Sequence, residues 1–331
     1  MKEGYWKDKR IFVTGATGII GSWLTKALVE LGGYVVTLVY DQNPESEIIR
    51  SDFIKRVQLV MGNLEDYQTL ESAIREYEID SVFHLGAQAI VLDANRSPLP
   101  TFETNIRGSY NLLEACRVND NAVKRVVVAS SDKAYGDSDV LPYTEDMPLL
   151  GCHPYDVSKS CTDLLARSYW HTYQLPVSIA RCGNVYGGGD LNWSRIVPGT
   201  IRSIIENQAP IIRSDGTFVR DYIYVEDVAQ AYITLAEAID LPGIAGEAFN
   251  FTSDLTMPVV EIVNTILRLM SREDLEPVIL NEAKAEIKNQ HLSSAKASKL
   301  LGWKSCHTLD EGLQMTVQWY RDYFGKNKGQ C

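Results

Sequence analysis

The sequence predicts an α/β protein in which a doubly wound parallel sheet is covered by helices on both faces and is joined to a smaller α+β lobe. Two observations carry this prediction. Up to residue 181, short apolar segments rich in Val and Ile alternate with segments whose apolar residues recur at helical spacing. The short segments are continuously apolar rather than alternating with polar residues, which is typical of parallel strands buried on both faces.

The elements of the first half follow in order from these runs and from the glycines that end them. The first strand, residues 11–14, ends at Gly15, and the helix after it, residues 23–31, ends at Gly32 and Gly33. The same alternation predicts strands at 34–40, 57–61, 81–85, 125–130 and 177–181, and helices at 69–77, 101–118 and 155–173.

The pattern changes after the three glycines at 187–189. This half contains one predicted strand, 248–251, and predicted helices at 197–207, 225–238, 259–270 and 309–324. We therefore expect residues 1–182 to form the sheet domain and residues 183–331 to form the second lobe, with segments near 225–251 returning to the first domain.

Composition excludes several classes of protein. The chain has 331 residues, 45% hydrophobic and 23% charged, which is typical of a globular protein, and its formal charge of −11 argues against a nucleic-acid partner. No C-x-x-C pair occurs among Cys116, Cys152, Cys161, Cys182, Cys306 and Cys331. This spacing predicts neither a metal site nor a disulfide framework. With no signal-peptide pattern and no long apolar run, we expect a cytoplasmic protein without a membrane partner.

A glycine-rich turn lies between the first strand and the first helix. The segment from Gly15 to Gly21 reads G-x-x-G-x-x-G, and such a turn lets the backbone approach a pyrophosphate at the positive end of a helix. Asp41 follows Gly21 by about 20 residues, where a carboxylate accepts hydrogen bonds from ribose hydroxyls and favours NAD over NADP. Taken alone, the glycines also suit an ordinary tight turn, and Asp41 also suits a turn cap.

Tyr155 and Lys159 are four residues apart on a predicted helix and therefore share one face. A nearby cation favours the phenolate, so Lys159 is expected to lower the pKa of Tyr155 and to make the phenol a general base for an alcohol. Tyr5 and Lys9 have the same spacing but precede the first strand, away from the carboxyl ends of the strands. The alternative for Tyr155 and Lys159 is an ordinary surface pair.

With these motifs in view, the chain is identified as a member of the extended short-chain dehydrogenases/reductases, a family that modifies nucleotide-activated sugars. The resemblance covers nearly the whole chain and rests on the glycine turn, His84 to Gln88, Thr104-Asn105, Ser131, Tyr155 with Lys159, Arg181 to Gly187, and Arg220 to Asp227. It implies a Rossmann-type fold, NAD as the cofactor, a nucleotide-sugar substrate, and a homodimer that pairs helices 101–118 and 155–173 across a two-fold axis.

The resemblance also assigns binding residues. For the cofactor it implies Gly15, Thr17, Gly18, Ile19, Ile20, Gly21, Asp41, Asn63, Leu64, Leu85, Gly86, Ala87, Gln88, Asn105, Tyr155 and Lys159. For the substrate it implies Gln88, Ser131, Asn184, Arg195 and Arg220, with the arginines near the diphosphate. Asn63 stands where the family usually has Asp, and Gly86 stands where alanine is common.

The segment Ser131-Asp132-Lys133 resembles the acid and base pair of the nucleotide-sugar 4,6-dehydratases, closest to those acting on CDP-glucose. The resemblance implies that Tyr155, assisted by Ser131 and Lys159, deprotonates the 4-hydroxyl while NAD takes a hydride. Lys133, with its pKa lowered by burial, then removes the C5 hydrogen, and Asp132 protonates the departing 6-hydroxyl. Two alternatives remain open: a nucleotide-sugar 4-epimerase and a non-catalytic regulator that senses NAD.

Overall fold

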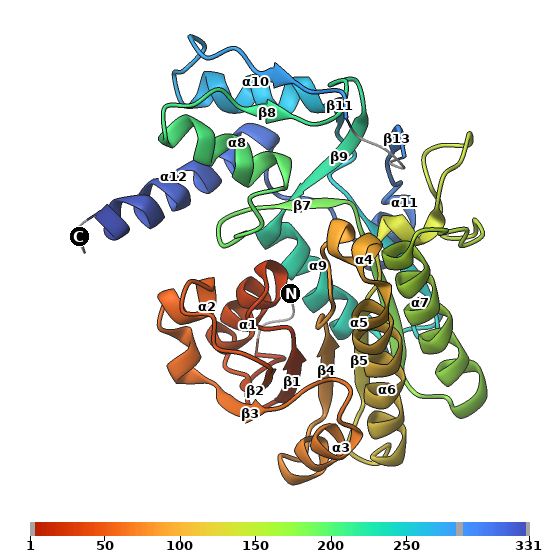
Figure 1. Ribbon diagram of the computed structural model, residues 1–331. Helices are drawn as coiled ribbons and strands as arrows, with labels where there is room; N and C mark the ends of the chain where they lie inside the picture. Colours follow the sequence, from red (N-terminus) through yellow and green to blue (C-terminus); the bar gives the residue numbers. More distant parts are fainter. Residues whose placement is uncertain (1–3, 283–286, 329–331) are drawn as a thin grey trace.

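The structure is a computed structural model, which describes residues 4–282 and 287–328. Its centre is a seven-stranded sheet with the order β10-β6-β5-β4-β1-β2-β3, in which every neighbouring pair is parallel. The strands are β1 (Arg10–Thr14), β2 (Tyr34–Val39), β3 (Gln58–Met61), β4 (Ser81–His84), β5 (Arg125–Ala129), β6 (Val177–Cys182) and β10 (Ala248–Phe251). The chain winds outward from β1 in both directions, as the sequence predicts (Figure 1).

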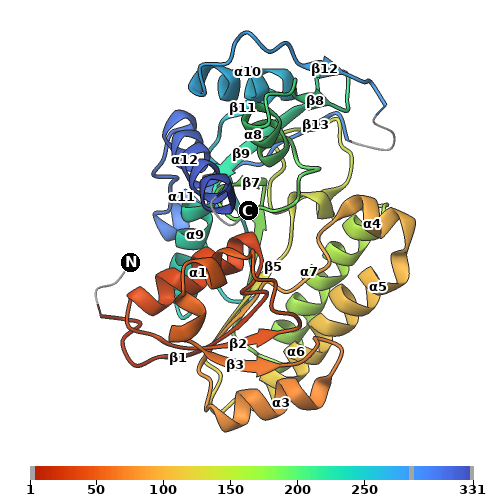
Figure 2. The same ribbon diagram turned by 60° about the vertical axis from the view of Figure 1, so that its left-hand side comes forward.

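Helices cover both faces of the sheet, which is why its strands are apolar throughout. Ile11 and Val13 of β1 face one core cluster, while Phe12 between them faces the other. The first face is covered by α1 (Ile19–Glu30) and α9 (Val225–Ala238), which contact each other. The opposite face carries α3 (Tyr67–Glu76), α6 (Gly108–Val118) and α7 (Pro154–Tyr173) (Figure 2).

The second lobe is built on β9 (Val219–Tyr224), which pairs with β7 (Asn184–Tyr186), β11 (Thr256–Pro258) and β13 (Asn289–Gln290). Its own apolar core lies among α8 (Ile196–Ile205), α10 (Val259–Leu269) and α12 (Leu309–Lys328). The two-stranded sheet of β8 (Ile211–Ile212) and β12 (Val278–Ile279) completes the lobe. The helix α11 (Ala295–Leu301) instead packs against β10 and α9 of the first domain.

Short helical pieces surround the sheet: α2 (Glu47–Arg50), η1 (Phe53–Arg56), α4 (Val91–Arg96), α5 (Pro98–Phe102), η2 (Glu103–Arg107) and η3 (Asp132–Tyr135). The predicted helix 101–118 spans the end of α5, the π-helical turn η2 and α6, so it is helical throughout but changes its hydrogen-bond pattern. Among the described residues, no helix is long and apolar enough to cross a membrane.

Two segments cross between the lobes. β9 belongs to the sheet of the second lobe and runs directly into α9. This helix packs against α1 on one face of the large sheet. β10 then completes the large sheet by pairing with β6. Residues 225–251 therefore lie with the large sheet, and the division of the chain at residue 182 stays a prediction.

Candidate active site

The glycine turn forms a close-packed cradle between β1 and α1. Gly15 has φ +76, and a Cβ there would lie 2.6 Å from the Gly86 nitrogen. A Cβ on Gly21 would overlap the Gly15 carbonyl oxygen. Gly18 is the N-cap of α1, so the free N–H groups of the first turn begin directly after it. The backbone is therefore open to a pyrophosphate at this helix end, which fits the dinucleotide that the sequence predicts.

The remaining predicted cofactor residues follow the carboxyl ends of β2, β3 and β4. Asp41 and Asn63 are exposed there, whereas Leu64 is buried. A Cβ on Gly86 would lie 2.9 Å from Leu64 Cδ1, so the alanine common at this position in the family would press on Leu64. The departure at Gly86 thus has a packing reason.

Asn105 is buried and is hydrogen-bonded to the segment that follows β4. Its Oδ1 accepts from the Gln88 nitrogen at 2.7 Å, and its Nδ2 donates to the Gln88 oxygen at 3.1 Å. The same Nδ2 donates to Ser158 Oγ at 2.9 Å. Asn105 therefore fixes Gln88 to α7, and its contact with the cofactor stays a prediction.

The predicted catalytic residues come together where β5 and α7 meet. Ser131 directly precedes η3, accepts from the Lys133 nitrogen at 3.2 Å and donates to Asp132 Oδ1 at 2.9 Å. The Ser131 side chain is also hydrogen-bonded to the phenol of Tyr155, and this bond lowers the Tyr155 pKa. Ser131 thus links the acid and base pair of η3 to the tyrosine of α7. These residues are distant in the sequence and are brought together by the fold.

The electrostatics of Tyr155 differ from the prediction. Burial raises the pKa of Tyr155 to about 12, although the Arg195 guanidinium and the Ser131 hydrogen bond oppose that rise. Lys159 instead donates to the Ala129 oxygen at 2.8 Å, and burial lowers its own pKa to about 8. The predicted lowering of the Tyr155 pKa by Lys159 is therefore wrong for this structure, because desolvation is the largest effect on that pKa and Arg195 is the cation that opposes it.

Arg195 lies close enough to Tyr155 to favour its phenolate. The guanidinium is held by Asp190 at 3.0 Å, and the Asp190 backbone oxygen accepts from Tyr320 at 2.6 Å. The sequence suggested Arg195 for the diphosphate, which stays a prediction. Its effect on the phenol had no local signal, because α8 and α7 are brought together only by the second lobe.

A second buried carboxyl accompanies Asp132. Burial raises the pKa of Asp132, against the opposing charge of Lys133. Asp221, on β9, is also buried, and burial together with the charge of Asp132 raises its pKa to about 7. Like charges so close disfavour double ionisation, and this repulsion adds to the effect of burial on the pKa of Asp221. Asp221 lies in the family segment from Arg220 to Asp227 but was not predicted as a site residue.

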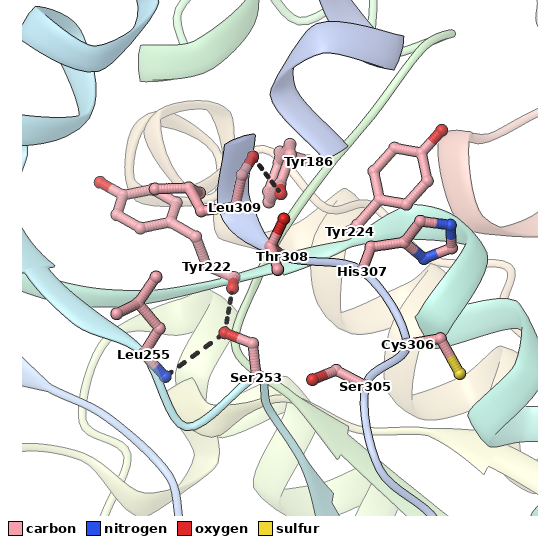
Figure 3. A pocket seen from close by; sticks show the side chains of 10 residues that line it. All are labelled: Tyr186, Tyr222, Tyr224, Ser253, Leu255, Ser305, Cys306, His307, Thr308 and Leu309. Atoms are coloured by element: carbon pink, nitrogen blue, oxygen red, sulfur yellow. Dashed lines mark hydrogen bonds between the residues drawn. The ribbon is translucent and has the colours of Figure 1, made fainter. Parts of the chain in front are cut away.

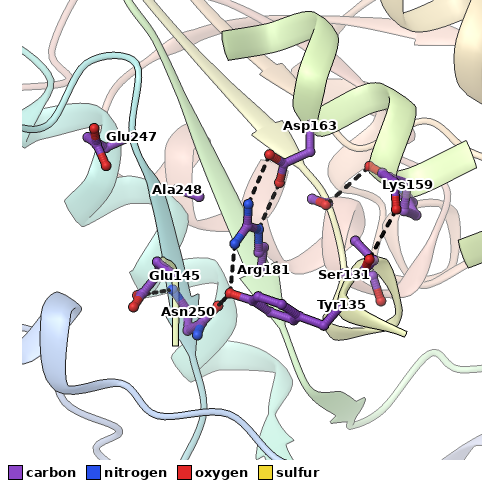
Figure 4. Close-up of polar contacts among 12 residues, drawn as sticks. Ser131, Tyr135, Glu145, Lys159, Asp163, Arg181, Glu247, Ala248 and Asn250 are labelled. Carbon is purple, nitrogen blue, oxygen red and sulfur yellow. Dashed lines mark hydrogen bonds and ion pairs between the residues drawn. The ribbon is translucent and has the colours of Figure 1, made fainter. Parts of the chain in front are cut away.

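A buried polar network ties η3 to α7 from behind (Figure 4). Arg181 on β6 makes two bonds to Asp163 of α7, at 2.7 and 2.9 Å, and a third to the Tyr135 hydroxyl at 2.7 Å. The Tyr135 hydroxyl donates to Asn250 Oδ1 at 2.8 Å, and Asn250 Nδ2 donates to the Tyr143 backbone oxygen at 3.0 Å. The network fixes the acid and base pair relative to the tyrosine helix.

The residues predicted for the substrate lie between the lobes. Asn184 Nδ2 donates to the Asp221 backbone oxygen at 3.2 Å. The Arg220 guanidinium donates to the backbone oxygens of Val219 at 2.8 Å and Lys288 at 2.9 Å. Their backbone partners hold both side chains in place at the join of β7 and β9.

A separate pocket of about 330 Å³ opens on the second lobe. Figure 3 shows its lining, made by Tyr186, Tyr222, Tyr224, Ser253, Leu255, Ser305, Cys306, His307, Thr308 and Leu309. None of the predicted site residues lines this pocket. Among the described residues, no group of His, Cys, Asp or Glu side chains could hold a metal ion.

Known proteins resemble the chain over most of its length. Residues 11–250 match the NAD dependent epimerase/dehydratase family. The CDP-glucose 4,6-dehydratase of Salmonella typhimurium is 31% identical over 96% of this chain and 92% of its own. The dTDP-glucose 4,6-dehydratase of Streptomyces venezuelae, solved with NAD bound, superposes with a TM-score of 0.84 at 28% identity, covering 96% of this chain and 98% of its own. The UDP-glucose 4-epimerase of Thermotoga maritima superposes with a TM-score of 0.86 at 28% identity, covering 95% and 99%.

Proposed function

The chain belongs to the NAD-dependent epimerase/dehydratase family, and from this premise we propose that it is a nucleotide-sugar 4,6-dehydratase of the CDP-glucose type. It converts a nucleotide-activated hexose into the 4-keto-6-deoxy sugar. The observation that carries this proposal is the pair Asp132 and Lys133 on η3, beside Ser131. An epimerase that returns the hydride to C4 has no step for such a pair.

The first step is removal of the proton from the sugar 4-hydroxyl by Tyr155. The phenolate that this step needs is favoured by the Arg195 guanidinium and by the Ser131 hydrogen bond. Ser131 also stabilises the oxygen that becomes the ketone. When bound, NAD accepts the hydride from C4 and later returns it to C6, so no external oxidant is consumed.

The second step is the loss of water from C5 and C6. The new ketone acidifies the C5 hydrogen, and the amine of Lys133 removes it as a proton. Asp132 gives its proton to the departing 6-hydroxyl, so that water leaves and a C5–C6 double bond forms. Burial raises the pKa of Asp132 and so helps this carboxyl to hold that proton. Lys133 then returns a proton to C5 as C6 receives its hydride.

The activity is tested by incubating the purified protein with CDP-, UDP-, GDP- and dTDP-glucose and weighing the products. A dehydratase yields a product lighter by one water molecule, and CDP-glucose is the expected substrate. A 4-epimerase is the second candidate, because the epimerase of Thermotoga maritima superposes as well as the dehydratase does. It would leave the mass unchanged and invert C4. Binding of NAD without turnover of any sugar would support a regulator instead.

We also propose that the chain forms a homodimer through α6 and α7. These helices contact each other, yet they leave Tyr110 and Leu164 41% and 54% exposed. Two copies pairing these faces would bury them in a four-helix bundle. Light scattering coupled to gel filtration tests the proposal, and Leu164→Glu is expected to yield monomers.

A further inference from the structure

The second lobe reaches the acid and base pair through one side chain. Gln290 lies on β13, opposite Arg220 of β9, and its Oε1 accepts a hydrogen bond from Lys133 Nζ at 2.7 Å. Lys133 and Gln290 are 157 positions apart, and Gln290 is not one of the predicted site residues. The contact therefore joins the amine of η3 to the lobe that covers it.

The chain that follows Gln290 is hydrogen-bonded to both the first domain and the second lobe. The His291 oxygen accepts from the Tyr143 nitrogen at 2.9 Å, which ties the strand to the loop after η3. The Leu292 nitrogen donates to Asp221 Oδ2 at 3.0 Å, which ties it to β9. These bonds fix the backbone on the carboxyl side of Gln290, so its amide meets Lys133 in one defined place.

The amide has one orientation, and that orientation is costly to the fold. A lysine ammonium can only donate, so the atom facing Lys133 is the amide oxygen. The Nε2 of Gln290 is then left without a hydrogen-bond partner among the described residues, although the side chain is fully buried. A buried donor without a partner destabilises a protein by about 1–3 kcal/mol. An apolar residue here would remove this donor but also the acceptor of Lys133.

We propose that Gln290 is a positioning residue for Lys133, an inference that rests on the proposed dehydratase function. The amide oxygen holds one N–H of the amine and so fixes the direction of the lone pair that takes the C5 proton. Being neutral, the amide orients the amine without favouring the ammonium form as a carboxylate would.

The charges around Lys133 show why a neutral acceptor matters. Asp132 of η3 and Asp156 of α7 are both buried, and the charge of Lys133 acts on the pKa of each. Arg220 of β9 adds a cation beside Asp132. A carboxylate in place of the Gln290 amide would add a further acid to this group and hold Lys133 in its charged form.

Two substitutions at Gln290 test the inference, with one matched control. Gln290→Leu removes the acceptor, and kcat for dehydration should fall by about 10- to 100-fold through misplacement of the amine. Formation of the reduced cofactor at C4 should persist, because that step does not use Lys133. Gln290→Glu should restore dehydration at high pH only, moving its pH profile upward by about one unit or more. Asn289→Asp adds the same charge to the exposed face of the same strand and should leave the profile in place.

A measurement without substrate separates this inference from the proposed function. Trace acylation of the lysines, read by peptide mass spectrometry, should show Lys133 reacting about tenfold more slowly at neutral pH in Gln290→Glu than in the Asn289→Asp control. Unchanged acylation together with an unchanged pH profile of dehydration would overturn the role of Gln290 and leave the dehydratase standing. Slowed acylation in a protein that dehydrates no nucleotide sugar would support the pairing and overturn the proposed function.

Discussion

The hydroxyl of Tyr135 offers a sharp test of how the fold holds its catalytic pair. Tyr135 is 2% exposed, and its hydroxyl accepts from Arg181 at 2.7 Å and donates to Asn250 at 2.8 Å. Tyr135→Phe removes that oxygen and keeps the ring. One N–H of a buried guanidinium and one buried amide oxygen then lose their partners.

The expected loss follows from the two bonds. A hydrogen bond to a charged group contributes about 1.5–3 kcal/mol and a neutral one about 1 kcal/mol, so the free energy of unfolding should fall by about 2.5–4 kcal/mol. Arg181 keeps both of its bonds to Asp163, so the substitution should weaken the fold without abolishing it. The rate of dehydration should fall as well, because η3 loses one of its links to α7.

Urea unfolding, followed by tryptophan fluorescence, measures the loss. Tyr143→Phe is the matched control, because Tyr143 is buried, stacks on Tyr135 with ring centroids 4.8 Å apart and donates only to the neutral Gly136 oxygen. The control should lose about 1 kcal/mol. Equal losses in the two variants would refute the claim that the guanidinium depends on Tyr135.

Three further predictions concern the site. Lys133→Met should abolish dehydration while C4 oxidation persists, seen as the ultraviolet absorbance of the reduced cofactor; unimpaired dehydration would remove Lys133 from the mechanism. Arg195→Met should shift the pH profile of C4 oxidation upward, because the guanidinium opposes the rise of the Tyr155 pKa to about 12, whereas Arg195→Lys should keep most of the effect. Burial lowers the pKa of Lys159 from 10.5 to about 8, so the unfolded chain binds this proton more tightly, and the stability of the wild type relative to Lys159→Met should rise with pH between these values by about 3 kcal/mol. Lys159→Met should lack this rise, and parallel stability curves for the two proteins would contradict the account.

Much of the first domain could be predicted because its signals are local. A strand such as β5 is continuously apolar, and the glycines from Gly15 to Gly21 lie where a tight turn and a helix start require them. β9 was not predicted because the adjacent Arg220 and Asp221 interrupt its apolar residues. Its burial comes from packing between the lobes, which no window of the sequence contains.

The site was predictable to the same degree. The motif at Ser131, Asp132 and Lys133 and the spacing of Tyr155 and Lys159 indicated which side chains would meet. Their electrostatics did not follow, since the pKa of Tyr155 depends on burial and on an arginine from another element. The contact between Gln290 and Lys133 has no sequence signal at all, because both partners are ordinary residues of distant segments.

The crossing of β9 into α9 and β10 has a consequence for dissecting the protein. An excised fragment that ended at residue 182 would lack α9, whose apolar residues pack with those of α1 in one core cluster. It would also lack β10, which would leave β6 as an unprotected sheet border open to pairing with other molecules. Such a fragment is expected to aggregate, so the nucleotide-binding half must be studied within the intact polypeptide.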